Sequence, residues 1–237
     1  MKTAIITGGG TGIGLACAKA LAGEQFRVGL IGRRGAVIET AAQAITRTGG
    51  ESWWGAVDVR DEAAVTAFVE SAVAQYGKID LLVNSAGVFW MKPFEETTLE
   101  LWDETIDVNL KGAFICAKAV WPHIEGGQII NISSVAGLRA FPGNAAYCAS
   151  KFGLNGLSEV LALEGEKRNI RVHLVCPGNT QTPTWGDQAP AEVRARMMPP
   201  EAVAEVVRWL AVSPPEVTFD KVVVNPARDP WSDPKGL

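Results

Sequence analysis

The sequence predicts an α/β protein built on a doubly wound, seven-stranded parallel sheet in a single domain. Short apolar runs alternate with longer segments of helical period along most of the chain, which is typical of repeated βαβ units. The first apolar run passes directly into a glycine-rich turn and then a helix, from Thr7 to Gly14. At 237 residues the chain is long enough for one such domain with a sizeable core.

Composition excludes several classes of protein. Hydrophobic residues make up 47% of the chain and charged residues 20%, as in a folded globular protein rather than a disordered one. A net charge of −4 provides no basic field for nucleic acid or an anionic membrane. The apolar run at the N-terminus is too short for a signal peptide or a membrane span. We therefore expect a cytoplasmic protein without nucleic-acid or membrane partners.

Cysteine and histidine are too sparse to predict a metal site. The four cysteines stand singly, with no C-x-x-C pair, and the chain has two histidines. The thiols are expected to be reduced core residues.

Seven strands and six helices are expected in alternation. The strands are Thr3–Thr7, Arg27–Ile31, Ser52–Val57, Ile79–Asn84, Gln128–Ile132, Ile170–Val175 and Lys221–Val224. The helices are Gly12–Gly23, Gly35–Arg47, Asp61–Tyr76, Leu99–Ile124, Ala145–Arg168 and Pro200–Ala211. Residues 1–224 form the expected domain, and residues 225–237, with three prolines, are expected to form an extended tail.

The glycines after the first strand predict a phosphate-binding turn. They are spaced G-x-x-x-G-x-G, from Gly8 through Gly12 to Gly14, which is not the G-x-G-x-x-G dinucleotide fingerprint. Glycine lets the backbone approach a pyrophosphate closely, and the helix N-terminus offers free N–H groups and a positive dipole end. A flexible glycine turn without a ligand is the alternative.

The end of the second strand bears on the choice of cofactor. An NAD-selective site places a carboxylate here for the ribose 2′-hydroxyl, but this chain reads Gly32-Arg33-Arg34. Gly32 leaves nothing to repel a 2′-phosphate, and Arg33 can pair with one through its forked guanidinium, assisted by Arg34. This favours NADP over NAD, and a solvated basic pair is the alternative.

Two further turns suit the same ligand. Asp58-Val59 follows the third strand, where a carboxylate can accept a hydrogen bond from an adenine amino group, although Asp is also a common helix cap. After the fourth strand, Asn84-Ser85-Ala86-Gly87 is made of small residues, so a flat ring can lie close to the backbone. An ordinary turn is the alternative there.

Tyr147 and Lys151 are four residues apart and would share one face of a helix. An ammonium beside a phenol favours the phenolate, so Lys151 is expected to lower the pKa of Tyr147 towards that of a usable general acid or base. The pair alone is equally consistent with a half-buried tyrosine and a solvated lysine.

Polar residues elsewhere complete the candidate site. Ser134 ends the fifth strand, thirteen residues before Tyr147, and its hydroxyl can bond the same substrate oxygen. Asn109 lies within a helical segment although Asn is a poor helix former, so it either caps a kink or holds a water. The turn Pro177–Thr182 follows the sixth strand and would pass over the nicotinamide end of a cofactor.

This ordered set of segments resembles the short-chain dehydrogenase/reductase family in its compact form. The set is Thr7–Gly14, Asn84–Gly87, Asn109, Ser134, Tyr147 with Lys151, and Pro177–Thr182. The resemblance covers roughly residues 2 to 212. It implies a Rossmann fold and hydride transfer between NADP(H) and a small carbonyl or alcohol substrate.

The resemblance also implies a role for each matching residue. Tyr147 would be the acid/base, and Lys151 would tune it while bonding the nicotinamide ribose. Ser134, favoured over Ser133 by its spacing to the tyrosine, would orient the carbonyl, and Asn109 would hold a water of the proton relay. The implied cofactor-binding residues are Gly8, Gly10, Thr11, Gly12, Ile13, Gly14, Arg33, Arg34, Asp58, Val59, Asn84, Ala86, Gly87, Tyr147, Lys151, Pro177, Gly178, Thr180 and Thr182.

The chain departs from the family in the segments that meet the substrate. The family's glycine pair after the last strand is replaced by Asn225-Pro226-Ala227, an ending more like that of the subgroup acting on small hydroxy acids or aldehydes. The segment 182–199, which usually covers the substrate, is short. Trp90, Met91, Phe141 and Trp185 are expected either to wall the substrate or to make core or subunit contacts. Arg139 is expected either to anchor a substrate carboxylate or to lie on the surface.

The sequence also predicts an assembly and leaves two alternative functions open. The segments Leu99–Ile124 and Ala145–Arg168 are expected to expose Phe114, Val120, Phe152 and Leu157, which predicts a homodimer or homotetramer through these helices. The alternatives to an NADP-dependent oxidoreductase are an NAD-preferring dehydrogenase and a catalytically quiet nucleotide-sensing or scaffold protein. The last is expected to lack Tyr147 or Lys151, and both are present.

Overall fold

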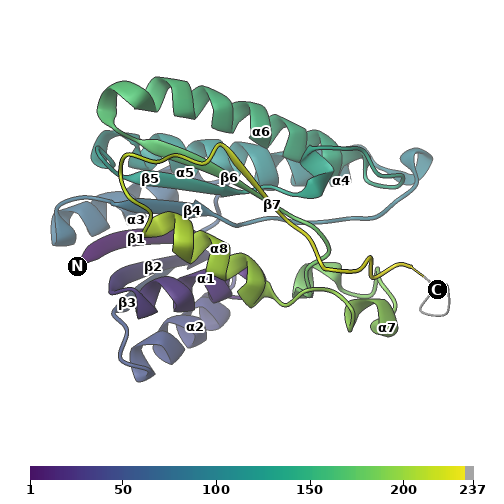
Figure 1. Ribbon diagram of the computed structural model, residues 1–237, viewed down its shortest axis with the longest axis horizontal. Helices are drawn as coiled ribbons and strands as arrows, with labels where there is room; N and C mark the ends of the chain where they lie inside the picture. The colour runs from purple at the N-terminus through teal and green to yellow at the C-terminus, as the bar shows by residue number, and fades with distance from the viewer. Residues whose placement is uncertain (233–237) are drawn as a thin grey trace.

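Seven parallel strands form one sheet at the centre of the protein, whose computed structural model describes residues 1–232 (Figure 1). The strands are β1 (Lys2–Thr7), β2 (Phe26–Gly32), β3 (Ser52–Ala56), β4 (Leu81–Asn84), β5 (Gln128–Ile132), β6 (Arg171–Pro177) and β7 (Lys221–Val224). Their order across the sheet is β3-β2-β1-β4-β5-β6-β7. The predicted α/β fold class is confirmed, and the strand ends differ from the predicted ones only slightly.

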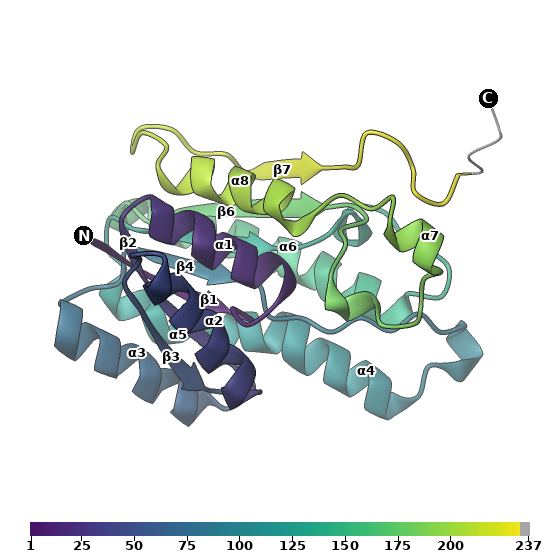
Figure 2. The same ribbon diagram turned by 90° about the horizontal axis from the view of Figure 1, so that it is seen from below.

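Helices cover both faces of the sheet (Figure 1 and Figure 2). On one face lie α1 (Gly12–Gly23), α2 (Gly35–Arg47) and α8 (Pro200–Ala211), and on the other α3 (Glu62–Tyr76), α5 (Gly112–Val120) and α6 (Ala145–Gly165). Successive strand residues therefore enter opposite cores, as Ile5 and Ile6 do, which explains why the strands are continuous apolar runs. Within residues 1–232 no helix has the length and hydropathy needed to cross a bilayer.

The chain is helical from Leu99 to His123, close to the predicted Leu99–Ile124, but it is not a regular α-helix throughout. The chain forms α4 (Leu99–Ile106), a π-helical segment (Asp107–Lys111), α5 and a 3₁₀ turn (Trp121–His123). Asn109, inside the π-helical segment, directs its side chain to the backbone of Val88. Gly112 lies so close to Val59 that a Cβ there would be 2.6 Å from a valine methyl. Single π turns of this kind are frequent near functional sites.

Two segments beyond the carboxyl ends of the strands were not predicted as ordered structure. One contains α7 (Ala191–Arg194), and the other is residues 225–232, which end in a turn where the Asp229 carboxylate accepts a hydrogen bond from the Trp231 N–H. Figure 1 and Figure 2 both place these segments at the same end of the molecule. The segment predicted as an extended tail contains bends and a turn up to residue 232 and lies near α7, and residues 233–237 lie outside the described part.

The strand order changes direction at β1, which pairs with β2 on one side and β4 on the other. In open parallel sheets, ligands bind in the crevice outside the carboxyl ends of the strands at this point. The turns after β1 and β4 therefore define where a functional site should lie.

Candidate functional site

A cleft of about 1080 Å³ runs along the carboxyl ends of the strands. The turns after β1 to β6 line it, together with part of residues 225–231. The predicted cofactor residues that line it are Gly8, Gly10, Thr11, Gly12, Ile13, Gly14, Arg33, Arg34, Asp58, Val59, Ala86, Gly87, Tyr147, Lys151, Pro177, Gly178, Thr180 and Thr182. Among residues 1–232 no cluster of His, Cys, Asp or Glu is suited to hold a metal.

Asn84, predicted to bind the cofactor, does not line the cleft. It is the last residue of β4, and its side chain is buried between strands, where Nδ2 donates to Asn131 Oδ1 of β5 at 2.9 Å. Asn84 therefore joins two strands of the sheet below the site.

The turns after β1 and β4 are packed together at backbone distance. Gly8 has a φ of +65°, and a Cβ there would lie 2.9 Å from Ala86 Cα. A Cβ at Gly14 would lie 2.3 Å from the Gly8 carbonyl oxygen, so neither position has room for a side chain. Thr7 Oγ1 accepts hydrogen bonds from the N–H groups of Ser85 and Ala86, both at 2.9 Å. These contacts fix the floor of the cleft at the switch in strand order.

The N-terminus of α1 faces the cleft without a side-chain cap. Thr11 holds the capping position but makes no side-chain hydrogen bond there, and the first turn contains no acidic residue. Gly12 has a φ of +53°, and a Cβ there would come within 3.2 Å of the Thr182 methyl, so the turn after β6 closes over this helix end. Free N–H groups and a positive dipole end suit a pyrophosphate, so the site fits a dinucleotide.

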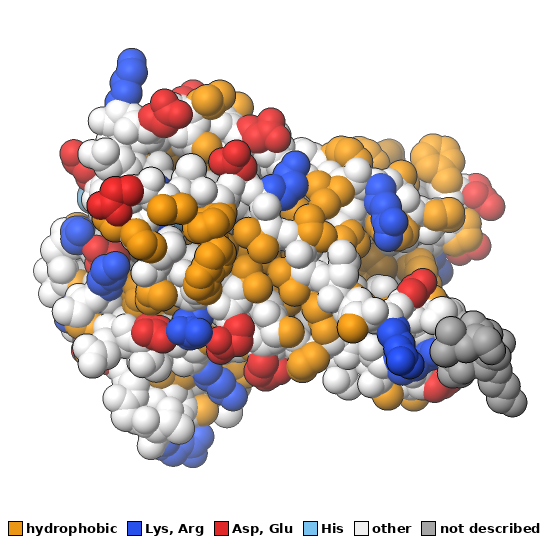
Figure 3. Space-filling model, viewed as in Figure 1, with side chains coloured by type: hydrophobic (Ala, Val, Ile, Leu, Met, Phe, Trp, Pro, Cys, Tyr) orange, Lys and Arg blue, Asp and Glu red, His pale blue; other side chains and the backbone are white. Residues whose placement is uncertain are grey.

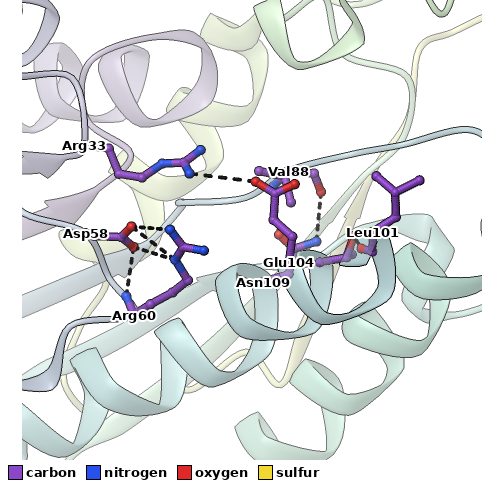
Figure 4. A network of polar contacts seen from close by, with 8 residues as sticks. Arg33, Asp58, Arg60, Val88, Leu101, Glu104 and Asn109 are labelled. Atoms are coloured by element: carbon purple, nitrogen blue, oxygen red, sulfur yellow. Dashed lines mark hydrogen bonds and ion pairs between the residues drawn. The ribbon is translucent and has the colours of Figure 1, made fainter. Parts of the chain in front are cut away.

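Charged residues gather where the cleft passes β2 and β3 (Figure 4). Arg33 Nη1 lies 3.8 Å from Glu104 Oε1. Arg60 donates hydrogen bonds to both carboxylate oxygens of Asp58, from Nε to Oδ1 at 3.0 Å and from Nη2 to Oδ2 at 2.6 Å. The hydrogen bond from Arg60 holds the pKa of Asp58 below its usual value. The Arg33 side chain is 50% exposed, so its long contact with Glu104 is weak and easily exchanged for a stronger one.

The expectation that nothing near Arg33 repels a 2′-phosphate is therefore wrong. Gly32 carries no carboxylate, but α4 brings Glu104 to Arg33 from a distant part of the chain. The carboxylate of Asp58, expected to accept from an adenine amino group, is already engaged by Arg60. The contact of Arg33 with Glu104 has no signature in the sequence, because it depends on how distant segments meet, whereas Asp58 and Arg60 are two residues apart in one turn.

Tyr147 and Lys151 share one face of α6, as their spacing predicts. Lys151 is buried, and its Nζ lies 5.6 Å from the centre of the Tyr147 ring. The same nitrogen donates to the carbonyl oxygen of Ile132, at the end of β5, at 2.9 Å. Tyr147 is partly exposed in the cleft. The end of β5 thus fixes the ammonium next to the phenol.

The expected lowering of the Tyr147 pKa is wrong. Burial raises the pKa of Tyr147 to about 12, although a hydrogen bond with Ser134 opposes the rise. Burial lowers the pKa of Lys151 to about 8. Removing each group from water penalises its charged form, which is the phenolate for Tyr147 and the ammonium for Lys151. At neutral pH Tyr147 therefore keeps its proton, and Lys151 is mostly charged.

The two serines after β5 differ in their surroundings. Ser133 donates to Asn155 Oδ1 at 2.6 Å inside the protein. Ser134 lies next to Tyr147, and its Oγ accepts from the N–H of Ala136 at 3.0 Å. Because the Ser133 hydroxyl is already engaged in the interior, the geometry favours Ser134 as the partner of the tyrosine.

Asn109 is buried and does not line the cleft. Its Oδ1 accepts from the Val88 N–H at 2.8 Å, and its Nδ2 donates to the Val88 carbonyl at 2.9 Å and to Ser150 Oγ at 3.1 Å. These bonds tie the π-helical segment to the turn after β4 and to α6. Its expected role in holding a relay water stays a prediction.

The cleft beside Tyr147 has aromatic walls. The Phe89 ring meets the rings of both Tyr147 and Trp185, with centroids 4.9 Å apart in each pair. The predicted substrate residues that line the cleft are Met91, Arg139, Phe141 and Trp185. Trp90 does not line it, and Phe89 lies there instead. The two residues are neighbours in a segment without helix or strand, so no periodicity distinguished them.

Besides Phe89, three residues at this end of the cleft were not predicted. Trp231 and Asp229 line it from the C-terminal segment, and Gln188 joins its two flanking segments. A tryptophan within a proline-rich tail was the only available signal, and it did not show that the tail packs against the segment after β6. The four cysteines, by contrast, lie buried and unpaired.

Comparison with known proteins agrees with this geometry. A model of the short chain dehydrogenase family matches residues 2–192. The chain belongs to this family. It is accordingly an oxidoreductase of the NAD(P)-dependent dehydrogenase and reductase type, which binds a nicotinamide cofactor.

Relatives and solved structures resemble this short-chain dehydrogenase over most of its length. D-threitol dehydrogenase of Mycolicibacterium smegmatis is 40% identical over 179 residues, which are 74% of this chain and 69% of the relative. The alcohol dehydrogenase of Thermococcus sibiricus, solved with 5-hydroxy-NADP, has a TM-score of 0.90 and 27% identity, covering 96% of this chain and 97% of the other. A metagenomic short-chain oxidoreductase solved with NADP has a TM-score of 0.83 and 35% identity, with the same coverage.

Proposed function

We propose that the protein interconverts a carbonyl compound and its alcohol with NADP(H), using Tyr147 as the acid/base. The observation that carries this proposal is that Ser134, Tyr147 and Lys151 meet in one cleft with the uncapped N-terminus of α1 and with Arg33. One end of the cleft therefore suits proton transfer and the other suits phosphate.

Each part of the cleft matches a part of a dinucleotide. The turn after β1 and the N-terminus of α1 would hold the pyrophosphate, and the turns after β4 and β6 would flank the nicotinamide. Arg33 would exchange its contact with Glu104 for a bidentate one with the 2′-phosphate. Both solved structures described above were obtained with an NADP compound, which supports this choice. When bound, the nicotinamide supplies or takes up the hydride.

The chain's own groups would handle the proton. A hydride reaching the carbonyl carbon builds negative charge on the oxygen, and Tyr147, protonated at neutral pH, can donate to it. Ser134 would supply a second hydrogen bond, and the Lys151 ammonium, held by the Ile132 carbonyl, would stabilise the phenolate that remains. The scaffold alternative is disfavoured because both Tyr147 and Lys151 are present.

Replacing Tyr147 with Phe keeps the ring against Phe89 but removes the proton. Turnover of carbonyl compounds, followed by NADPH absorbance, should fall by about 10²-fold or more, while NADPH binding is largely kept. Tyr76→Phe is the matched control, because Tyr76 is the other of the two tyrosines and packs against Trp53 outside the cleft. Normal turnover by the Tyr147→Phe variant would show that the proposed mechanism is wrong.

Arg33 and Glu104 should act on cofactor choice in opposite directions. Arg33→Ala removes the cation and should weaken NADPH binding about tenfold or more while leaving NADH nearly unchanged. Glu104→Gln removes the competing carboxylate and should tighten NADPH binding severalfold. Glu100→Gln, on the same helix α4 and without an ion pair to residues 1–232, is the control. The measurement is fluorescence titration with both cofactors. Equal or tighter binding of NADH than of NADPH by the unmodified protein would contradict the choice of NADP.

The protein is also proposed to be a homodimer or homotetramer. Phe114 of α5 and Phe152 of α6 are each 48% exposed, as predicted, but Val120 is fully buried against the sheet and Leu157 is half-buried. Val120 was misplaced because it lies six residues after Phe114 in α5, which puts the two side chains on different sides of the helix, with Val120 facing the core. Figure 3 shows a second gathering of hydrophobic side chains across the face that carries β7 and α8. Trp209, Val212, Val217 and Val223 are exposed in this region.

Sedimentation at micromolar concentration should therefore show a dimer or a tetramer. Phe152→Glu places a charge on the exposed face of α6 and should shift the distribution towards smaller species. The control is Glu159→Gln, a polar change on an exposed residue of the same helix. A monomer for the unmodified protein would rule out this assembly.

A further inference from the structure

Three aromatic rings from three distant segments form one continuous wall at the substrate end of the cleft. Phe89 follows β4, Trp185 follows β6, and Trp231 comes from the C-terminal segment 225–232. The centroids of Trp185 and Trp231 lie 6.3 Å apart, and Phe89 links Trp185 to Tyr147 at 4.9 Å on each side. The wall therefore extends from the phenol of Tyr147 to the C-terminal segment.

Hydrogen bonds to the backbone hold each segment of this wall in place. Trp185 donates its indole N–H to the carbonyl of Thr180 at 2.9 Å. Gln188 accepts from the Met91 N–H at 2.6 Å and donates to the Phe89 carbonyl at 3.1 Å, so it joins the segments that carry Trp185 and Phe89. The C-terminal segment is held by Arg196, which donates to the Ser232 carbonyl at 2.8 Å.

Several polar groups near the wall contact neighbouring residues. The indole N–H of Trp185 is satisfied by Thr180, as described. The Arg139 guanidinium lies over the Phe141 ring at 5.1 Å, and the Asp229 carboxylate accepts from the Trp231 N–H at 3.0 Å. The faces of the three rings offer the hydroxyls of a polyol no strong hydrogen-bond partner, whereas a flat apolar group would cover them.

We propose that the C-terminal segment 225–232 is part of the substrate site and that the substrate carries an aromatic or similarly flat apolar group next to its carbonyl or alcohol carbon. The proposal rests on the proposed function. In the reducing direction a hydride from NADPH is added to the carbonyl carbon and a proton from Tyr147 to its oxygen, which gives the alcohol and NADP⁺. The apolar group would lie along Phe89, Trp185 and Trp231, with the carbonyl oxygen at Tyr147 and Ser134.

The test compares kcat/KM for acetophenone, 2-butanone and a small polyhydroxy ketone in the full-length protein with NADPH. The unmodified protein should prefer acetophenone to 2-butanone by about tenfold or more, the range that extra apolar contact in a pocket provides. Trp231→Ala should reduce this ratio about tenfold, chiefly through KM, and Trp231→Phe should restore most of it. Trp209→Ala is the matched control, because Trp209 is 46% exposed, close to the 44% of Trp231, but packs on Phe219 away from the cleft.

The outcomes separate this inference from the function on which it rests. The inference alone would be overturned if the protein turns over these ketones but Trp231→Ala leaves the ratio of kcat/KM for acetophenone to that for 2-butanone unchanged. A preference for the polyhydroxy ketone would also overturn it alone. No NADPH oxidation with any of the three ketones would contradict the proposed function and the inference with it. Circular dichroism of each variant would show that a changed ratio does not come from unfolding.

Discussion

The close packing of the turns after β1 and β4 is the constraint on which the rest of the site depends. Gly14 packs against the carbonyl of Gly8, and Gly8 packs against the backbone of Ala86. Thr7 Oγ1 accepts hydrogen bonds from two N–H groups of the turn after β4. This contact sets the distance between the N-terminus of α1 and the far wall of the cleft. With that distance fixed, phosphate-binding groups and the Tyr147 phenol face one continuous space.

Burial gives the candidate catalytic pair its chemistry. The protein desolvates both Tyr147 and Lys151, which raises the pKa of the first to about 12 and lowers that of the second to about 8. A protonated phenol beside a mostly charged ammonium is suited to donating a proton as charge develops on a substrate oxygen. Such desolvation opposes folding, and the hydrogen bond from Lys151 to the Ile132 carbonyl offsets part of it.

The features that depend on local residue pattern were predicted from the sequence, whereas those that depend on contacts between distant segments were not. The strands, most helices, the glycine turn and the spacing of Tyr147 and Lys151 follow from periodicity and residue type. The π-helical segment does not, because Asn109 is drawn to the backbone of Val88 by tertiary contacts. For the same reason no pattern predicted that Glu104 would reach Arg33, or that the tail would bring Trp231 to Trp185. Desolvation likewise reversed the expected shift of the tyrosine pKa.

The most direct test of the account is whether the packing at Gly14 is required for dinucleotide binding. Gly14→Ala places a Cβ 2.3 Å from the Gly8 carbonyl oxygen, whereas Gly23→Ala, at the other end of α1, meets nothing within 4 Å. Calorimetric titration should show NADPH binding at least about tenfold weaker for Gly14→Ala, a loss of about 1.4 kcal/mol, and unchanged for Gly23→Ala. Circular dichroism should show both variants folded. Unchanged NADPH affinity in a folded Gly14→Ala variant would contradict the account.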